Sequence, residues 1–548
     1  EWTQALLLMD GLDERQFNGF LDSLRAASPA YEGLKAIVTP TNRKWTVTRL
    51  MEDLLKERSA MEASSLQTTQ TMSPSDRALM DRLDGWFDTH FEEILADLQD
   101  MVRVPSVAVY DEAPPYGEDC LKALKTMLDL GERYGLQGEN HEDRYGSLLY
   151  GGDGTGDPGQ EIAVWCHLDV VPPGDGWQLT EPFVPRRVGN WLIGRGADDN
   201  KGPAVGVLHV LRALRELGIQ LRHPVRFFFG TDEEQGMGDV QYHAKHARQS
   251  ALQIIADCGF PVCYGEKGVL TFSLVTRERI PHVRTACAGR ADNIIPNLAV
   301  MELAEIELAL PLPDHLPETV EALRLDDTVR LTAHGRSGHS AFPEGSLNAI
   351  SELLSALKSI CPEPVFTFLA DAAQGFDGSA LGLNGSDEVS GSTTCVPVGL
   401  KCLEDGRLSV RFNSRTCISA DQEALRKHLS ELCAEHGFTL EDVEQKPSSY
   451  FPPEHPAVAA LTEACNAVTG LSLKPYVMAG GTYAKYLERA LGFGFGGLMG
   501  EAREADSKIF APGHGGCHMP DEGLYLPAYR QALTVFSMGL LAADRVLD

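Results

Sequence analysis

The hydrophobic and polar positions of the chain form short apolar runs that alternate with stretches of helical period. Three runs are almost wholly apolar, as in strands buried on both faces: residues 161–168, 224–230 and 252–256. Between the first two, residues 201–218 carry apolar positions at helical spacing, with Pro203 near their start. This order predicts right-handed crossovers and an α/β fold, with a mostly parallel sheet and helices on both faces.

The pattern changes along the chain and divides it into four expected parts. Residues 270–447 hold alternating segments and turns rich in Gly, Ser and Asp, which predict an inserted α+β lid or substrate-binding domain. Residues 73–269 and 448–548 resume the strand–helix pattern and are expected to form one catalytic domain. Residues 1–72 are expected to form a helical N-terminal extension and linker, because apolar positions recur at helical spacing over residues 17–24.

A helix start marks the beginning of the catalytic domain. Ser73 is suited to the N-cap position and Pro74 to the first helical position. Asp76 then falls in the first turn, where the helix dipole favours a negative charge. We therefore expect a helix from residue 74 onward.

Composition narrows the class of protein. The 548 residues are 43% hydrophobic and 23% charged, an ordinary globular mixture. Lys and Arg number 48 against 78 Asp and Glu, a net charge of −30, so nucleic acids and anionic membranes are poor partners. Twelve scattered cysteines without a CxxC pair are typical of reduced thiols. With no recognisable secretory signal and no run near the roughly 18 apolar residues that span a bilayer, we expect a cytoplasmic protein.

Polar clusters follow the three apolar runs directly. These positions lie beyond the carboxyl ends of the expected strands, which is where ligands bind in open α/β sheets. The clusters are His167 with Asp169, then Asp232, Glu233 and Glu234, then Asp257. Two further clusters lie in a glycine-rich loop and near the end of the chain: Asp198 with Asp199, and His514 with His518. Taken alone, each cluster is more often structural than functional: paired carboxylates usually lie on a solvated surface, a histidine is usually part of the core, and Asp beside Gly usually forms a turn.

Together these clusters favour a metal site. Carboxylates that converge at one sheet edge repel each other unless a cation neutralises them. Two histidines with three carboxylates suit a pair of zinc-type or manganese-type ions, with one carboxylate shared between ions about 3.5–4 Å apart. The Glu233-Glu234 pair can supply one ligand and one free base.

The ordered motifs resemble a known family over about residues 80–548. They are "PPGDGWQLTEPF" (172–183), "GRGADDNKG" (194–202), "GTDEEQG" (230–236) and "GRSGHSAFPEGSLNA" (335–349). This set resembles the dizinc metallopeptidases that include carnosinase, aminoacylase and glutamate carboxypeptidase. The segments "DCGFPVCYGEKG" (257–268) and "GGTYAK" (480–485), with the long insert, are most similar to the PepV-type dipeptidase branch.

The resemblance implies a role for each matching ligand position. His167 and Asp257 would hold one divalent ion, and Glu234 and His518 the other. Asp199 would bridge the two ions. The ions are expected to be zinc, with manganese or cobalt as alternatives. His514 competes with His518 as the late ligand, and the sequence after His518 favours the latter.

The same resemblance implies the acid–base chemistry. Asp169 would orient His167 and tune its basicity. Glu233 would be the general base, taking a proton from a water that bridges the two ions and attacks the scissile carbonyl. The same carboxyl would then protonate the leaving amine.

The inserted segment would contribute to substrate binding. His339 matches the family histidine that stabilises the tetrahedral oxyanion, and Asn293 resembles a substrate-contacting position. Arg411 would grip a substrate carboxylate or the tetrahedral oxygens through its planar fork, with Arg415 as the rival.

Two further features stay open at this point. Gly481 and Thr482 precede a predicted helix whose N–H groups could hold a C-terminal carboxylate, and a plain tight turn is the alternative. Three cysteines neighbour proposed ligands, and we expect them to serve packing: Cys166, Cys258 and Cys517.

The leading hypothesis is a metal-dependent dipeptidase for short peptides with a free N-terminus. One chain would supply both the metal ligands and the covering residues Asn293 and His339, which favours a monomer. An N-acyl amino acid deacylase or a carboxypeptidase would use the same site, and a non-catalytic binding protein is a further alternative. The net charge and the motifs disfavour a two-metal phosphatase or nuclease.

Overall fold

The computed structural model describes residues 6–9, 34–37, 72–152, 154, 156–304, 316–361 and 363–547. Contacts divide the chain into two compact units: Glu1–Pro74 with Gly470–Ser472, and Ser75–Thr469 with Leu473–Asp548. In the first unit, β1 (Leu6–Met9) and β2 (Leu34–Ile37) pair in parallel. The helical expectation for residues 1–72 is therefore wrong at these eight residues, and residues 17–24 lie outside the described part.

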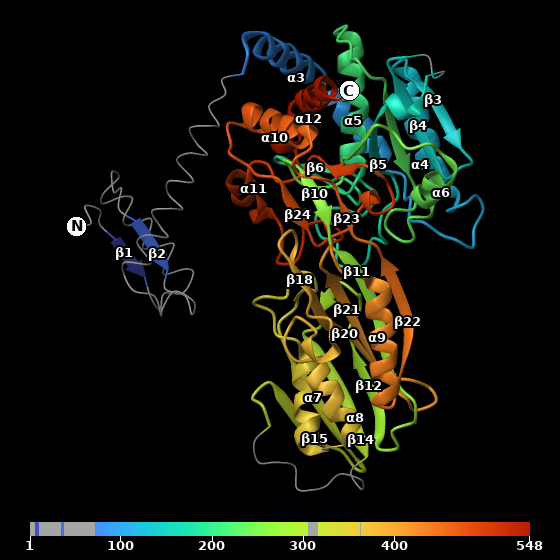
Figure 1. Ribbon diagram of the computed structural model, residues 1–548, viewed down its shortest axis with the longest axis vertical. Coiled ribbons are helices and arrows are strands. Elements are labelled where there is room, and N and C mark those ends of the chain that lie inside the picture. Colours follow the sequence, from blue (N-terminus) through green and yellow to red (C-terminus); the bar gives the residue numbers. More distant parts are fainter. Residues whose placement is uncertain are drawn as a thin grey trace. The chain divides into compact units, whose positions relative to one another are not determined.

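The second unit contains two large sheets, of which the nine-stranded mixed sheet lies in the upper half of Figure 1. Its strands lie in the order β23 (Ser449–Tyr450), β10 (Cys263–Glu266), β25 (Ala490–Gly492), β9 (Leu252–Ile255), β5 (Ile162–His167), β8 (Val225–Gly230), β4 (Tyr145–Tyr150) and β3 (Gln137–His141), and β24 (Tyr476–Met478) also pairs with β10. The central strands β25, β9, β5 and β8 are parallel, whereas β4, β3 and β23 pair antiparallel with their neighbours. The predicted α/β fold is confirmed. The sheet is mixed rather than mostly parallel, because four of its strand pairs are antiparallel and four, mostly at its centre, are parallel.

Helices cover both faces of this sheet because side chains alternate along its strands. Val164 and Cys166 of β5 join a core with α3 (Pro74–Val102), α4 (Glu118–Arg133), α5 (Lys201–Glu216), α10 (Pro456–Thr469) and α12 (Leu526–Val546). Ala163 and Trp165 point to the other face and pack with residues of α6 (Gly238–His246). The start of α3 at Pro74 is as predicted.

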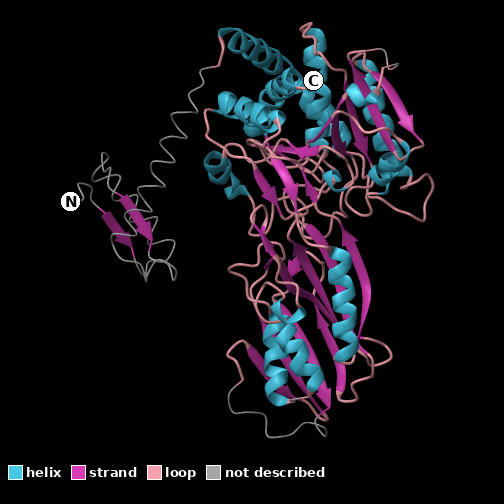
Figure 2. Ribbon diagram, viewed as in Figure 1, coloured by secondary structure: helices cyan, strands magenta, loops and turns pink. Residues whose placement is uncertain are grey.

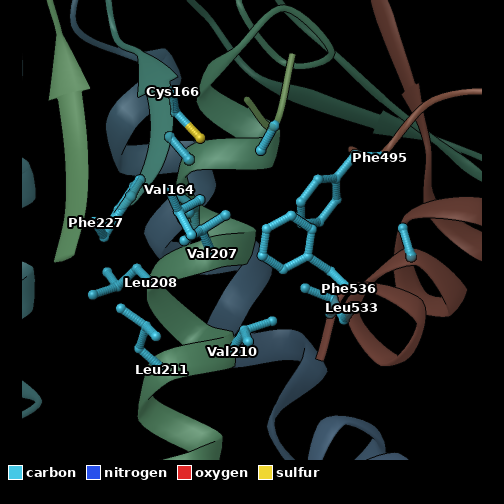
Figure 3. Packing of buried hydrophobic residues seen from close by; sticks show 14 of the residues in the cluster. Val164, Cys166, Val207, Leu208, Val210, Leu211, Phe227, Phe495, Leu533 and Phe536 are labelled. Atoms are coloured by element: carbon cyan, nitrogen blue, oxygen red, sulfur yellow. The ribbon is translucent and has the colours of Figure 1, made fainter. Parts of the chain in front are cut away.

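The core beside α5 is packed on several sides by large apolar groups (Figure 3). Val207 and Val210 on α5 are fully buried, as are Leu533 and Phe536 on α12. The rings of Phe495 and Phe536 stack with centroids 5.3 Å apart. Full burial of each such side chain contributes about 1.5–3 kcal/mol. This packing fixes α5, and with it the loop that precedes its first turn.

An eight-stranded sheet forms the inserted α+β domain. Its strands lie in the order β15 (Val320–Arg324), β16 (Thr328–His334), β14 (Leu298–Ala304), β12 (Val283–Ala288), β20 (Thr394–Cys402), β21 (Leu408–Thr416), β11 (Gly268–Thr276) and β22 (Phe438–Lys446). Every neighbouring pair is antiparallel. One face packs in a second core with α7 (Ala349–Ile360), α8 (Pro364–Ala372) and α9 (Gln422–Glu435). Figure 2 shows these helices lying along the sheet.

The described part also contains small ribbons, a short helix, and the 3-10 helices Pro158–Gln160, Ser379–Leu381, Tyr483–Lys485 and Ser507–Ile509. The ribbons are β13 (Ile294–Ile295) with β17 (Gly338–His339), β18 (Ser386–Asp387) with β19 (Gly391–Ser392), and β6 (Arg186–Val188) with β7 (Trp191–Ile193) and β26 (Gly523–Tyr525). The short helix is α11 (Gly500–Asp506). Within the described ranges, no helix combines the length and the apolar character needed to cross a membrane.

Candidate metal centre

The five predicted ligands converge at the carboxyl ends of the parallel strands. His167 is the last residue of β5, Glu234 follows β8, and Asp257 follows β9. Asp199 lies in the loop before α5, and His518 lies in the loop before β26. Strand order brings these segments together because parallel strands end at the same edge of a sheet.

The ligand atoms form two groups of three that share Asp199. In the first group, His167 Nε2 lies 3.0 Å from Asp199 Oδ1 and 3.8 Å from Asp257 Oδ2. In the second, His518 Nε2 lies 3.0 Å from Asp199 Oδ2 and 3.1 Å from Glu234 Oε1. The atoms of each group all lie within 4.8 Å of one another. Each oxygen of Asp199 therefore faces a different group.

These distances fit divalent cations. Two nitrogen or oxygen ligands bound to one tetrahedral zinc at about 2.0–2.2 Å lie roughly 3.3–3.5 Å apart. The observed separations of 3.0–3.8 Å span that value. The donor set, imidazole nitrogen with carboxylate oxygen, also suits zinc, manganese or cobalt. The residues present thus fit a pair of ions.

The electrostatics of the cluster also favour bound cations. Burial raises the pKa of Asp257 to about 7; His167 opposes this shift, and the negative charges of Asp199 and Glu234 add to it. Burial lowers the pKa of His518, but hydrogen bonds to Asp199 and Glu234 outweigh it and raise the pKa to about 11. A protonated imidazole therefore neutralises these carboxylates when no cation does.

Asp169 contacts both a ligand and the two glutamates. Its backbone oxygen lies 3.0 Å from His167 Nδ1, whereas its carboxylate Oδ1 lies 3.5 Å from that nitrogen. The carboxylate accepts the backbone N–H groups of Glu233 at 3.1 Å and of Glu234 at 3.0 Å. Asp169 therefore orients His167 through its carbonyl and positions the glutamate pair through its side chain.

Glu233 belongs to neither ligand group. Its side chain is buried, and its Oε1 has no hydrogen-bond partner within the described residues. Burial raises the pKa of Glu233 well above its usual value; His167 opposes this shift, and the charges of Asp257 and Glu234 add to it. A buried carboxyl oxygen without a partner, beside a cluster of ligands, is suited to accept and return a proton.

Sequence reasoning did not single out Asn200, which ties the first ligand group together. Its Oδ1 accepts the backbone N–H of His167 at 3.3 Å. Its Nδ2 donates to Asp257 Oδ1 at 2.8 Å and to the backbone oxygen of Ala256 at 3.1 Å. The sequence feature that could have identified Asn200 is its position directly after Asp199 in the glycine-rich loop motif.

Glu522, which follows His518 by four residues, was missed as well. Its Oε1 accepts three backbone N–H groups of the loop before α5, from Gly196, Asp198 and Asp199, at 3.0, 3.1 and 3.1 Å. Its Oε2 accepts a hydrogen bond from Arg195 Nη1 at 2.6 Å. Glu522 therefore holds the backbone of Asp199 from a buried position.

The other late histidine has a separate partner. His514 Nδ1 lies 2.7 Å from Asp521 Oδ2, and Asp521 also accepts the N–H groups of residues 178–179. The structure thus places His518, not His514, with the second ligand group. Three cysteines belong to neither group: Cys166, Cys258 and Cys517.

His339 lies in the inserted domain, close enough to His518 for the charge of that residue to act on its ring. The backbone N–H of Ala341 donates to His339 Nδ1 at 3.1 Å, so the neutral ring carries its proton on Nε2. Although part of its surface is exposed, partial desolvation lowers the pKa of His339, and the positive charges of Arg415 and His518 act in the same direction. Asn293, which was predicted to contact the substrate, lies beside this segment, since its backbone oxygen accepts the N–H of Ser340 at 2.9 Å.

The two candidate arginines on β21 differ in their partners. Arg411 donates from Nε and Nη2 to the two oxygens of Asp292, both at 2.7 Å, and from Nη2 to Glu444 at 2.6 Å. Arg415 donates to Asn413 Oδ1 and to the backbone oxygen of Ala479, each at 3.1 Å. No carboxylate of the described residues pairs with Arg415. The fork of Arg411 is therefore occupied, and the alternative Arg415 is the arginine whose charge reaches His339.

The predicted helix after Gly481 and Thr482 is a three-residue 3-10 helix, Tyr483–Lys485. The N–H and hydroxyl groups of Thr482 donate to the buried Glu266 at 3.0 and 2.6 Å. The expectation of free N–H groups is therefore wrong at Thr482. A Cβ on Gly481 would lie 2.0 Å from Lys485 Cε, so a larger residue here would force the buried Lys485 side chain to move.

Comparison with known proteins places most of the chain in one family. The model of peptidase family M20/M25/M40 matches residues 163–540, and a domain of unknown function, DUF3783, matches residues 5–61. YtjP, a proposed dipeptidase of Bacillus subtilis, is 28% identical over 76% of this chain and 93% of its own length. A proposed dipeptidase of Staphylococcus saprophyticus is 26% identical over 73% of this chain and 89% of its own length.

Solved structures share the fold. Human carnosine dipeptidase 1 matches with a TM-score of 0.51 and 16% identity, over 85% of this chain and 100% of that one. The dipeptidase Dug1p of Saccharomyces cerevisiae matches with a TM-score of 0.52 and 14% identity, over 86% of this chain and 99% of that one.

Proposed function

Because the chain belongs to peptidase family M20/M25/M40, we propose that it is a dinuclear metallo-dipeptidase for short peptides with a free N-terminus. The observation that carries the proposal is Asp199, whose two oxygens face two separate groups of ligand atoms. The relatives of Bacillus and Staphylococcus support the dipeptidase assignment, since each is a proposed dipeptidase matched over about nine-tenths of its length.

Each group of ligands would hold one divalent ion. His167 and Asp257 would hold the first and Glu234 and His518 the second, with Asp199 bound to both. We propose zinc, with manganese or cobalt as alternatives. When bound, the ions would supply Lewis acidity that polarises the scissile carbonyl and makes the attacking water more acidic.

Glu233 is the proposed general base. Its unpartnered Oε1 takes a proton from the attacking water as the new C–O bond forms. The same carboxyl then gives that proton to the amine as the C–N bond breaks, so the side chain returns to its starting state. Asp169 contributes by fixing the backbone of Glu233.

His339 and Arg415 are the proposed substrate-binding groups. With its proton on Nε2, His339 offers one N–H donor to the oxyanion that develops on the former carbonyl. Arg415 keeps N–H donors without a carboxylate partner among the described residues, so it suits the C-terminal carboxylate of a substrate. We propose Asn293 as a further contact, and no such role for Arg411. Since one chain carries all these residues, we expect a monomer.

A cavity next to these groups would receive a substrate side chain. Its volume is about 410 Å³, within the roughly 300–1,000 Å³ that is usual for small-molecule sites. Both the inserted domain and the C-terminal segment line it, through Ala341, Phe342, Phe376, Val477, Met478 and Ala479. Lys267, Glu344 and Asp377 add charged groups at the wall. This lining suits short peptides with apolar or mixed side chains.

The test uses metal-free protein refilled with zinc, manganese or cobalt and a panel of free and N-acetylated dipeptides. We expect hydrolysis of the free members, and a fall in kcat of about 10²–10⁴-fold in Glu233→Gln with the metal content unchanged. Glu454→Gln, at an exposed glutamate, is the matched control and should match the wild type. Cleavage of only the acetylated members would replace the proposal with a deacylase. Absence of cleavage with both ions bound would refute it.

A further inference from the structure

A separate cluster of metal-ligating side chains lies in the inserted domain. His282 directly precedes β12, Cys361 directly follows α7, and Glu363 directly precedes α8. One ligand atom from each residue lies within 4.8 Å of the other two. These residues have no part in the proposed peptidase chemistry.

The spacing of the three atoms matches tetrahedral coordination. His282 Nε2 lies 3.7 Å from Cys361 Sγ and 3.6 Å from Glu363 Oε1, and Cys361 Sγ lies 3.4 Å from Glu363 Oε1. Zinc binds sulfur at about 2.3 Å and nitrogen or oxygen at about 2.0–2.2 Å, which places tetrahedral ligands about 3.6, 3.3 and 3.5 Å apart for the same pairs. The three observed separations agree with these values to within about 0.3 Å.

We propose that His282, Cys361 and Glu363 form a further metal site that binds Zn²⁺, with water as the fourth ligand. The donor chemistry selects the ion: a thiolate and an imidazole disfavour magnesium and calcium, and the tetrahedral spacing favours zinc. His282 and Cys361 are buried, whereas the Glu363 side chain is 46% exposed. The exposed carboxylate gives the ion a path from solvent and leaves room for the water.

The surrounding structure holds the ligands in place. The His282 ring contacts Phe366 of α8, with centroids 5.7 Å apart, and its backbone oxygen accepts the N–H of Ala304 at 2.8 Å. The backbone N–H of Cys361 donates to the last turn of α7, and that of Glu363 donates to the Cys361 oxygen at 2.7 Å. A bound ion would connect the start of β12 to the turn between α7 and α8. It would stabilise the inserted domain against local opening.

The test is a cobalt titration of the metal-free, full-length protein, followed by absorption and by metal analysis. The proposed peptidase ligands offer only nitrogen and oxygen, so a thiolate-to-cobalt charge-transfer band reports the new site and stays independent of the peptidase proposal. We expect this band in the wild type. Cys361→Ser should lose it and bind one ion per chain fewer.

Two cysteines provide matched controls. Cys433→Ser changes a buried cysteine on α9 of the same domain, and Cys517→Ser changes the thiol beside His518. Both should keep the band and the wild-type ion count. His282→Gln should also lose the band. This second variant tests the proposed site if Cys361→Ser fails to fold. Absence of the band, its persistence in both site variants, or its loss in Cys517→Ser would overturn the proposal and leave only a hydrogen-bonded cluster.

Discussion

Glu522→Gln is the substitution that most directly tests how Asp199, the proposed bridging ligand, is held. Glutamine keeps the size of the side chain and one oxygen for the N–H groups of Gly196, Asp198 and Asp199. It removes the negative charge that faces Arg195 across 2.6 Å. Both side chains of this ion pair are buried, with exposures of 1% and 0%. The variant therefore leaves a buried guanidinium opposite a neutral amide.

The size of the effect follows from the burial of the pair. Removing one partner of a buried ion pair costs about 3–5 kcal/mol. Burial raises the pKa of Glu522 to about 7, with Asp199 adding to the shift and Arg195 opposing it, so keeping this carboxylate ionised is itself costly. We therefore expect the lower end, about 3 kcal/mol less free energy of unfolding at pH 8. Because the loop also positions Asp199, metal affinity should fall about 10–100-fold.

The assay is urea unfolding of the metal-free protein at pH 8, with metal affinity measured by competition with a chelator. Arg195→Met combined with Glu522→Gln removes both charges and should recover part of the lost stability. Glu501→Gln, at an exposed position on α11, should change stability by less than about 0.5 kcal/mol. A loss below about 1 kcal/mol in Glu522→Gln, with unchanged metal affinity, would refute the reasoning.

Three further variants test other parts of the structure. Asp169→Asn removes one of the two oxygens that accept the glutamate N–H groups after β8, so kcat on a dipeptide should fall about 10–100-fold. Phe536→Ala empties a fully buried position and should lower the free energy of unfolding in urea by about 3–5 kcal/mol. Burial lowers the pKa of His243 from 6.5 to about 4. The neutral imidazole therefore stabilises the fold above pH 6.5, and this contribution is lost as the pH falls to 4. Over that range the wild type should lose about 3 kcal/mol more free energy of unfolding than His243→Phe.

Each of these variants has a control or a contradicting result. Val184→Ala shortens an exposed side chain and should change stability by less than about 0.5 kcal/mol. Unchanged kcat in Asp169→Asn would show that its carboxylate does not position the base. Parallel stability curves for the wild type and His243→Phe between pH 7 and 4 would contradict the assignment of the acid loss to this histidine.

The centre of the α/β fold and the grouping of polar residues were predictable because both depend on local pattern. The apolar runs at β5, β8 and β9 are long enough to be buried on both faces, and polar residues follow each run at once. Strand–helix–strand order then allows few topologies, and in these the parallel strands end at the same edge of the sheet. The polar residues that follow the strands were therefore expected to lie close together. The role of the converging residues as metal ligands stays a prediction.

Partner choice was not predictable. Arg411 and Arg415 lie on the same strand and differ little in local sequence, yet Asp292, more than a hundred residues away, occupies the first. Asp169 was expected to act on His167, which it contacts, but local sequence did not indicate that its carboxylate also accepts N–H groups from another strand end. No sequence pattern around Glu522 indicates its partner, and only the folded chain shows that it holds the loop before α5.

The sequence by itself determined the α/β class, the start of α3, the acidic charge and the types of donor available for a metal site. Those properties follow from residue type and from spacing within one element. The tertiary structure decided which atoms lie about 3 Å apart, and hence which carboxylates are paired, which arginine is occupied and which glutamate keeps an unpartnered oxygen. Hydrogen bonds and ion pairs act over such short distances that their partners are set only when packing brings remote segments together.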